Sequence, residues 1–331
     1  MSKKVYKPIK RLWIAAIVAV MLAAAVTFGG MWCGYTLLRA ALDGRRERPQ
    51  SITHLSEFAL REQMHEMHAV SQLNGWLSFV NVQEVELKIG MQRRCAKVYE
   101  PVRSSEHVPW ALVLHGGMGT DYTQVLDVAC EFSLAGYRVL APDLAAHGQS
   151  EGETTSLGLQ EKEDVAAWIA WIKQRDPLAE IVIYGHDEGA VAVLLAAGEE
   201  MDESVRAIIA DSPYLSADER CMQMLSEMTP EVTDLDRTLV RMAYRIVFGN
   251  PEQADVRDVI RQCTIPVLLI YGTGDEDTPA WYGEELLAAA KDNVRLLLIE
   301  GAVHGMARHG DPKTYYDEVL AYCSAALKTG N

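Results

Sequence analysis

Asp187 lies at the centre of a short glycine-flanked turn, between Gly185 and Gly189. An apolar run, residues 181–184, precedes the turn, and a long apolar segment, residues 188–198, follows it. This order is typical of a strand, a sharp turn and a helix, with the central side chain presented to a ligand. A carboxylate in that position is a candidate nucleophile or general base.

Two further polar residues follow later apolar strands. Asp275 lies in residues 272–279 (GTGDEDTP), and His304 lies in residues 301–305 (GAVHG). The carboxyl ends of parallel strands meet at one edge of a sheet, so we expect both side chains to lie near Asp187. The order nucleophile, acid, histidine predicts that Asp275 orients His304, which acts as the base. Asp211 also ends a strand and is an alternative acid.

A third loop, HGG at residues 115–117, follows an early apolar strand. Backbone N–H groups in this loop and just after Asp187 would stabilise a developing negative charge. We therefore assign an oxyanion hole to Gly117 and Glu188, since a residue without a side chain at 117 lets the backbone approach closely. A tight turn with no chemical role is the alternative interpretation of the same glycines.

A carboxylate nucleophile suits only some substrates. Attack on an ester gives an anhydride, whereas attack on a saturated carbon that carries a halide or an epoxide oxygen gives an alkyl-enzyme ester. His304 would then activate water to hydrolyse this ester. The charge expected on Glu188 disfavours release of an anion nearby, which favours an epoxide over a halide. Candidate donors to the leaving group are Tyr214, Tyr244, Trp281 and Tyr282.

The elements that position these residues span residues 81–328. Alternating side chains at 82–90 and 95–100 indicate an antiparallel hairpin, after which strands and helices alternate. Continuous apolar strands within this alternation favour a doubly wound, mostly parallel sheet of the α/β class. Residues 214–262 interrupt the pattern, are rich in Met, Arg and acidic residues, and are mostly helical in pattern. We interpret them as a lid inserted after the sixth strand.

The N-terminal region differs from the rest of the chain. A basic flank, residues 1–11, precedes residues 12–38, which contain no charged side chain. That stretch exceeds the roughly 20 residues needed to cross a bilayer and the roughly 7–15 apolar residues of a cleaved signal peptide. We therefore expect an uncleaved single-pass transmembrane anchor. The more basic N-terminal flank favours a cytoplasmic N-terminus and an extracytoplasmic domain. Residues 39–80 are predicted to form a juxtamembrane connection that includes an amphipathic helix.

Charge and cysteine usage exclude several kinds of partner. The formal net charge is −15, and residues 1–48 contribute +7 of it, so residues 49–331 carry −22. A surface this acidic repels phosphate backbones and argues against nucleic acid. The six cysteines are scattered without a C-x-x-C pair, and no histidine spacing matches a zinc motif. We expect neither a metal nor an organic cofactor, and a small-molecule substrate. The sequence does not indicate an oligomeric state.

These motifs together resemble the membrane-anchored α/β hydrolases of the serine esterase/aminopeptidase-like branch. The resemblance covers roughly residues 50–328, and the motifs that carry it are HGG-M-G at 115–119, PDLAAHGQSEG at 142–152, ADSPY at 210–214 and the two loops quoted above. It implies an eight-stranded sheet with a lid and a triad of serine, aspartate and histidine. The histidine and acid positions match His304 and Asp275, whereas Asp187 replaces the serine.

The turn itself has a second, shorter resemblance. GHDEGA at residues 185–190 is similar to the turn of epoxide hydrolases and fluoroacetate-type dehalogenases, whose nucleophile is aspartate. Three hypotheses therefore stand: a hydrolase that forms an alkyl-enzyme at Asp187, a catalytically inactive binding or scaffold protein that keeps the fold, and a carboxylesterase- or peptidase-like enzyme in which Asp187 activates water.

Overall fold

The computed structural model describes residues 6–45, 71–102, 107–117, 119–228 and 231–329. The chain forms two compact units: Met1–Ala41 with Met222–Asn250, and Leu42–Cys221 with Pro251–Asn331. Most of the predicted connection at 39–80 lies outside the described residues, as do the central residues of its amphipathic helix. The larger unit holds every predicted site residue except Tyr244.

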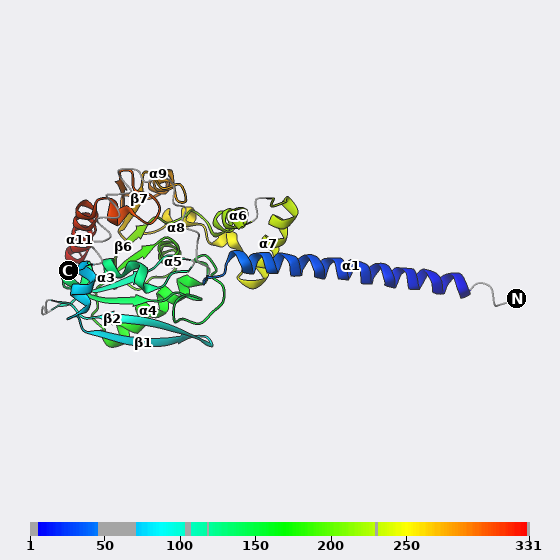
Figure 1. The fold of residues 1–331 in the computed structure, drawn as a ribbon, viewed down its shortest axis with the longest axis horizontal. Coiled ribbons are helices and arrows are strands. Elements are labelled where there is room, and N and C mark those ends of the chain that lie inside the picture. Colours follow the sequence, from blue (N-terminus) through cyan, green and yellow to red (C-terminus); the bar gives the residue numbers. More distant parts are fainter. Residues whose placement is uncertain (1–5, 46–70, 103–106, 118, 229–230, 330–331) are drawn as a thin grey trace. The chain divides into compact units, whose positions relative to one another are not determined.

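One eight-stranded sheet organises the larger unit, with strand order β1-β2-β4-β3-β5-β6-β7-β8 (Figure 1). β1 pairs antiparallel with β2, as the alternating pattern predicts, and β2 pairs antiparallel with β4. All other neighbours are parallel. The expected doubly wound, mostly parallel sheet is therefore confirmed. The strands are β1 (Val82–Ile89), β2 (Gln92–Tyr99), β3 (Trp110–Leu114), β4 (Arg138–Pro142), β5 (Ile181–His186), β6 (Val205–Asp211), β7 (Val267–Gly272) and β8 (Val294–Ile299).

The central strands are apolar along their whole length because helices cover both faces of the sheet. Ala111, Val113 and Tyr184 share one buried cluster with residues of α3 (Leu126–Leu134) and α11 (Pro312–Thr329). The intervening Leu112 and Ile183 are also fully buried, and α5 packs on β5 and β6. The remaining helices that follow strands are α4 (Glu161–Arg175), α5 (Glu188–Ala197), α9 (Ala280–Ala289) and the short α10 (Ala307–Gly310).

A helical insertion follows β6 where the sequence pattern changes. It contains α6 (Ala217–Met228), α7 (Asp234–Val247) and α8 (Val256–Ile260). α6 begins in the larger unit, but its part from Met222 onward belongs with α7 to the smaller unit. The helical character of residues 214–262 thus agrees with the sequence, whereas their role as a lid stays a prediction.

The smaller unit is built on one long helix. α1 (Tyr6–Ala41) packs against α7, and its residues Ile17–Ala41 have a mean hydropathy of 1.9 over a length sufficient to span a bilayer. Thr233 caps α7, since its side chain accepts from the Asp236 N–H while the Asp236 carboxylate accepts from the Thr233 backbone. Length and composition therefore make α1 a candidate membrane span.

Candidate active site

Asp187 occupies a strained turn between β5 and α5. Its backbone lies at φ 48° and ψ −112°, in a region that non-glycine residues rarely adopt. The two flanking glycines make this turn sterically feasible. A Cβ at Gly185 would lie 2.5 Å from the Gly189 carbonyl oxygen, and a Cβ at Gly189 would lie 2.4 Å from the His115 carbonyl oxygen. The turn therefore has the sharp strand-to-helix geometry that presents a side chain above the sheet.

A buried arginine lies beside the Asp187 carboxylate. One guanidinium nitrogen of Arg220, on α6, is 4.0 Å from Asp187 Oδ1. Arg220 is 2% exposed and Asp187 is 7% exposed, so both charges are removed from water. Each charge offsets part of the other's desolvation cost, which stabilises the ionised carboxylate that a nucleophile requires.

His304 and Asp275 form the hydrogen-bonded pair that the sequence predicts. His304 Nδ1 lies 2.9 Å from Asp275 Oδ2, and the Thr278 hydroxyl donates to the same oxygen at 2.7 Å. The other oxygen, Oδ1, accepts from the backbone N–H groups of Asp277 and Thr278 at 2.9 and 2.8 Å. Three donors thus hold the Asp275 carboxylate in place, and Asp275 in turn holds the histidine ring.

The electrostatic surroundings raise the pKa of His304. Burial is the largest influence and lowers the pKa, but the hydrogen bond to Asp275 and the negative charges of Asp187 and Asp275 outweigh it. The ring of His304 lies 6.1 Å, centre to centre, from that of His186, the residue before Asp187, which places the histidine near the turn. A raised pKa makes the neutral ring of His304 a stronger base. The nearby carboxylates stabilise the protonated ring that forms when it takes a proton from water.

The alternative acid, Asp211, makes its side-chain hydrogen bonds to residues other than His304. It accepts from the hydroxyls of Tyr184 at 2.8 Å and Tyr315 at 2.6 Å. His186 Nδ1 lies 3.8 Å away, too far for a hydrogen bond but close enough for an ion pair. These contacts hold the Asp211 carboxylate in a buried network below the turn, and they lower its pKa despite burial. The geometry therefore favours Asp275 as the acid.

The glycine loop is fixed to the sheet by its own histidine. His115 Nε2 accepts from the Leu144 N–H at 2.9 Å, and Nδ1 lies within hydrogen-bond distance of the Gly116 carbonyl oxygen at 2.5 Å. The Gly116 N–H donates to the Gln124 side chain at 2.7 Å. Gly117 lies against Glu188, because a Cβ added there would be 2.3 Å from Glu188 Oε2. The structure thus brings together the two residues assigned to the oxyanion hole.

Glu188 differs from the expectation in its charge. It is 1% exposed and accepts a hydrogen bond from the Thr155 hydroxyl. Burial, followed by the charge of Glu161 and with a further contribution from Asp187, raises its pKa well above the usual value. Burial therefore favours the neutral form of Glu188, which weakens the expected argument against a leaving anion nearby.

The four candidate donors to a leaving group lie in different surroundings. Tyr214 is buried, the Arg220 guanidinium lies 5.6 Å from its ring centre, and no described residue hydrogen-bonds its hydroxyl. Tyr282 is partly buried, and burial raises its pKa while the charge of Arg220 opposes the shift. Trp281 is 53% exposed and packs edge-on against Tyr282. Tyr244 belongs to the smaller unit, where it packs on Phe248.

Three residues that contact the candidate site were not predicted from the sequence. Thr278 had a usable signal, because an aspartate commonly accepts from donors two and three residues later. Arg308 is buried and donates to the carbonyl oxygens of Gly305 at 3.0 Å and Gln124 at 2.8 Å, which links the histidine loop to the short helix Tyr122–Val125. Arg220 had no signal, since its helix has no motif and its contact with Asp187 depends on the fold.

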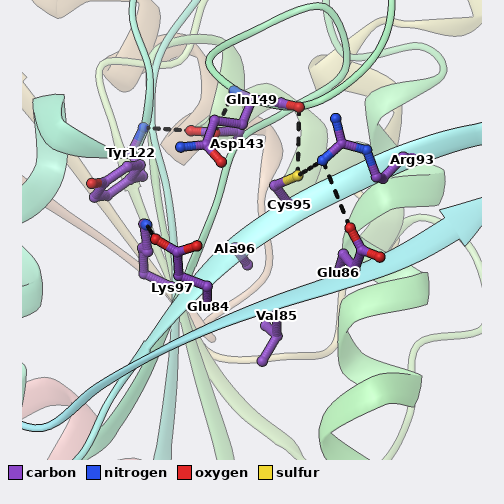
Figure 2. A pocket seen from close by; sticks show the side chains of 10 residues that line it. All are labelled: Glu84, Val85, Glu86, Arg93, Cys95, Ala96, Lys97, Tyr122, Asp143 and Gln149. Carbon is purple, nitrogen blue, oxygen red and sulfur yellow. Dashed lines mark hydrogen bonds and ion pairs between the residues drawn. The ribbon is translucent and has the colours of Figure 1, made fainter.

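A separate cavity lies on the hairpin side of the sheet. It has a volume of about 180 Å³ and is lined by residues of β1, β2 and neighbouring loops, including Cys95, Lys97 and Asp143 (Figure 2). None of the predicted site residues lines it. Burial raises the pKa of the Cys95 thiol, so Cys95 is a poor nucleophile. This cavity does not belong to the candidate active site.

Known proteins share this architecture. A family model described as alpha/beta hydrolase fold matches residues 109–246. A Pyrococcus furiosus esterase, Pf2001, superposes with a TM-score of 0.61 at 18% identity, covering 84% of this chain and 98% of that chain. Est1E from Butyrivibrio proteoclasticus superposes with a TM-score of 0.58 at 22% identity, covering 74% and 99%. The chain therefore has the α/β-hydrolase fold.

The curated sequence relatives match only part of the chain. The uncharacterized protein YqkD of Bacillus subtilis is 29% identical over 56% of this chain, and YfhR of Escherichia coli K12 is 28% identical over 59%. The matches span 62% and 63% of the lengths of those relatives. The human protein ABHD12B is 26% identical over 48% of this chain and 43% of its own length. None of these names states an activity for this chain.

Proposed function

We propose that the chain is a membrane-anchored hydrolase that acts on a small organic electrophile through a covalent intermediate at Asp187. α1 would serve as the single-pass anchor, with the N-terminus in the cytoplasm and the hydrolase domain outside. The observation that supports the mechanism is the placement of an ion-paired carboxylate at the strained turn, beside a histidine whose pKa it raises.

The reaction has two steps. An Asp187 oxygen attacks a saturated carbon, the bond from that carbon to its leaving oxygen breaks, and an alkyl-enzyme ester forms. His304, oriented by Asp275, then takes a proton from water, and the resulting hydroxide attacks the ester carbonyl carbon. The bond between that carbonyl carbon and the alkyl oxygen breaks, which releases an alcohol and restores the carboxylate. The proton held by His304 then returns to the group that protonated the leaving oxygen, so both regain their starting forms.

The leaving oxygen needs a proton and a positive neighbour. Tyr214 is suited to donate, because its buried hydroxyl has no hydrogen-bond partner among the described residues and its raised pKa keeps it protonated. Arg220 lies beside both Tyr214 and Asp187. Together with the raised pKa of Glu188, this favours an epoxide, whose oxygen stays attached to the product and accepts the proton.

Oxygen transfer tests this mechanism directly. The full-length chain in detergent micelles, in molar excess over an alkyl epoxide, is allowed one turnover in ¹⁸O-labelled water. The diol formed first should lack solvent label, because its new oxygen comes from Asp187, and the peptide that contains Asp187 should carry the label instead. Label in the first diol would show that water attacks the substrate directly, with Asp187 as a base. Asp187→Asn serves as the inactive control.

The buried Asp187–Arg220 pair also supports a second candidate, a binding protein without catalysis. A carboxylate held by an arginine fills the place of a serine hydroxyl and stabilises the turn without reacting. A panel of epoxides, haloalkanes and a short activated ester separates the candidates. If the wild type is inert on all of them and Asp187→Ser gains ester hydrolysis, the site frame is intact and the binding protein is the better description. Ester hydrolysis by the wild type would favour the carboxylesterase-like alternative.

A further inference from the structure

α1 and α7 approach each other closely through a pair of glycines. Gly30 and Gly34 lie four residues apart on α1, and both face Leu239 of α7. A Cβ at Gly34 would lie 2.5 Å from the Leu239 carbonyl oxygen, so only glycine permits this approach. Small residues at this spacing let helix backbones pack tightly within membranes. The contact identifies α7 as the packing partner of the candidate membrane span.

An apolar groove runs beside this contact. Its volume is about 620 Å³, and its α1 side lies between residues 24 and 35, which corresponds to roughly 16 Å along a helix. Every α1 residue of the groove falls inside the candidate span at Ile17–Ala41. The residues that line it are Ala24, Thr27, Phe28, Met31, Trp32, Tyr35, Ala243, Ile246 and Val247.

α7 presents apolar side chains outward rather than burying them. Leu235, Met242, Ile246 and Val247 are 66%, 45%, 64% and 41% exposed. Leu235, Met242 and Ile246 recur at helical spacing and therefore share one face. The arginines of α7, namely Arg237, Arg241 and Arg245, recur at four-residue intervals and form a separate stripe beside this apolar face. Helices with an arginine-rich face and an apolar face lie in the interface of a bilayer.

We propose that α7 is a second membrane element, embedded in the interface beside α1, and that the groove between them binds an acyl chain of a bilayer phospholipid. Acyl chains match the apolar lining, and the neighbouring arginine stripe of α7 matches anionic headgroups. Water is a poor occupant, because the groove offers it few polar partners. The proposal does not depend on the hydrolase chemistry, but it requires that α1 enters the bilayer.

Photolabelling from within the membrane tests the proposal. The full-length chain is reconstituted into phosphatidylcholine and phosphatidylglycerol vesicles that contain a phospholipid with a photoactivatable diazirine in its acyl chain. After irradiation, labelled peptides are mapped by mass spectrometry. Labelling is expected on the α1 peptide and also on the α7 peptide that includes Ala243–Val247.

Two variants of exposed residues on α7 make the test specific. Ile246→Asp puts a charge on the apolar face and should lower α7 labelling about fivefold, while α1 labelling stays unchanged. Thr238→Asp, outside the groove lining, is the matched control and should not alter the pattern. An unlabelled α7, or an unlabelled α1, would overturn the proposal. Chain-to-chain crosslinks through the groove in place of lipid adducts would also overturn it and would make a second copy the occupant.

Discussion

The candidate site has one half around Asp275 and His304 and another around Asp187. The two halves differ in the hydrogen bonds that their polar groups make. In the His304 half, the Asp275 carboxylate accepts from His304, from the Thr278 hydroxyl and from two backbone N–H groups. In the Asp187 half, the carboxylate has an arginine nitrogen at 4.0 Å, and the nearby Tyr214 hydroxyl has no hydrogen-bond partner among the described residues. Buried polar groups in folded proteins are normally paired, so the Tyr214 hydroxyl has hydrogen-bonding capacity available for a ligand.

This difference separates the preorganised part of the site from the part that receives a ligand. A base must be held in one orientation before the substrate arrives, and the contacts around Asp275 hold it. A group that forms a bond to the substrate must instead keep a lone pair or a donor available. We therefore propose that Tyr214 contacts the substrate, whereas Asp275 and Thr278 orient His304.

Removing the base should have the largest effect on turnover. In His304→Gln, attack by Asp187 proceeds but hydrolysis of the ester does not, because no group takes the proton from water. We expect steady-state kcat to fall about 10³-fold or more. Intact-mass spectrometry should show the enzyme increased in mass by one substrate molecule. Loss of turnover with no adduct would contradict this division of roles, because His304 would then be needed for formation of the ester as well as for its hydrolysis.

The buried ion pair should dominate the stability of the Asp187 half. Arg220→Met leaves the Asp187 carboxylate buried without its arginine, and Asp187→Asn leaves the Arg220 guanidinium buried without its carboxylate. Each variant should lower the free energy of unfolding by about 3 kcal/mol. The double variant should cost less than the sum by about 2 kcal/mol, because the pair is removed together. Urea unfolding of the full-length chain in micelles, followed by tryptophan fluorescence, measures the cycle. Additive effects would contradict a direct interaction.

The negative charge of Asp187 should measurably raise the pKa of His304. Because His304 must be neutral to act as a base and its pKa is raised, kcat should increase with pH through a midpoint above the ordinary value of about 6.5. Asp187→Asn removes one of the raising charges, so the pKa of His304 should fall. NMR titration of histidine-labelled protein measures this shift without turnover. Asp317→Asn, an exposed carboxylate on α11, is the matched control, and an equal shift there would attribute the effect to net charge.

The sequence predicted the half of the site that depends on local pattern. Asp275 and His304 each follow a continuous apolar strand, and parallel strands bring their carboxyl ends together whatever the intervening helices do. The sharp turn at Asp187 was also predicted from the sequence, because two glycines around a polar residue, between a strand and a helix, are typical of such a turn. The eight strands were predicted for the same reason, since apolar continuity and alternation are local properties.

The features that the sequence missed depend on burial and on distant contacts. Glu188 was expected to be charged, but its pKa depends on neighbours such as Thr155 and Glu161, which only the fold brings close. Arg220 lies on a helix without a motif. The division of the insertion between two units was also missed, because the contact of α7 with α1 depends on two glycines whose role appears only in packing.

Glu188 should add a pH dependence to the stability of the Asp187 half, because burial favours its neutral form. Its pKa is raised in the folded protein, so the folded state binds a proton that the unfolded state has released above about pH 4.3. Stability should therefore fall as pH rises, by at most about 1.4 kcal/mol per pH unit, until the raised pKa is passed. Glu188→Gln keeps the shape and cannot ionise, so its unfolding free energy should lack this slope.

The measurement is urea unfolding of wild type and Glu188→Gln at several pH values between 5 and 8. The variant should gain stability over the wild type as pH rises, with little difference at pH 5. Glu163→Gln, which replaces an exposed glutamate on α4, controls for the loss of a surface charge and should show no comparable trend. Parallel pH profiles for Glu188→Gln and the wild type would mean that Glu188 is ionised beside Asp187. The Asp187 half would then contain two adjacent carboxylates and would be a poor place for a leaving anion.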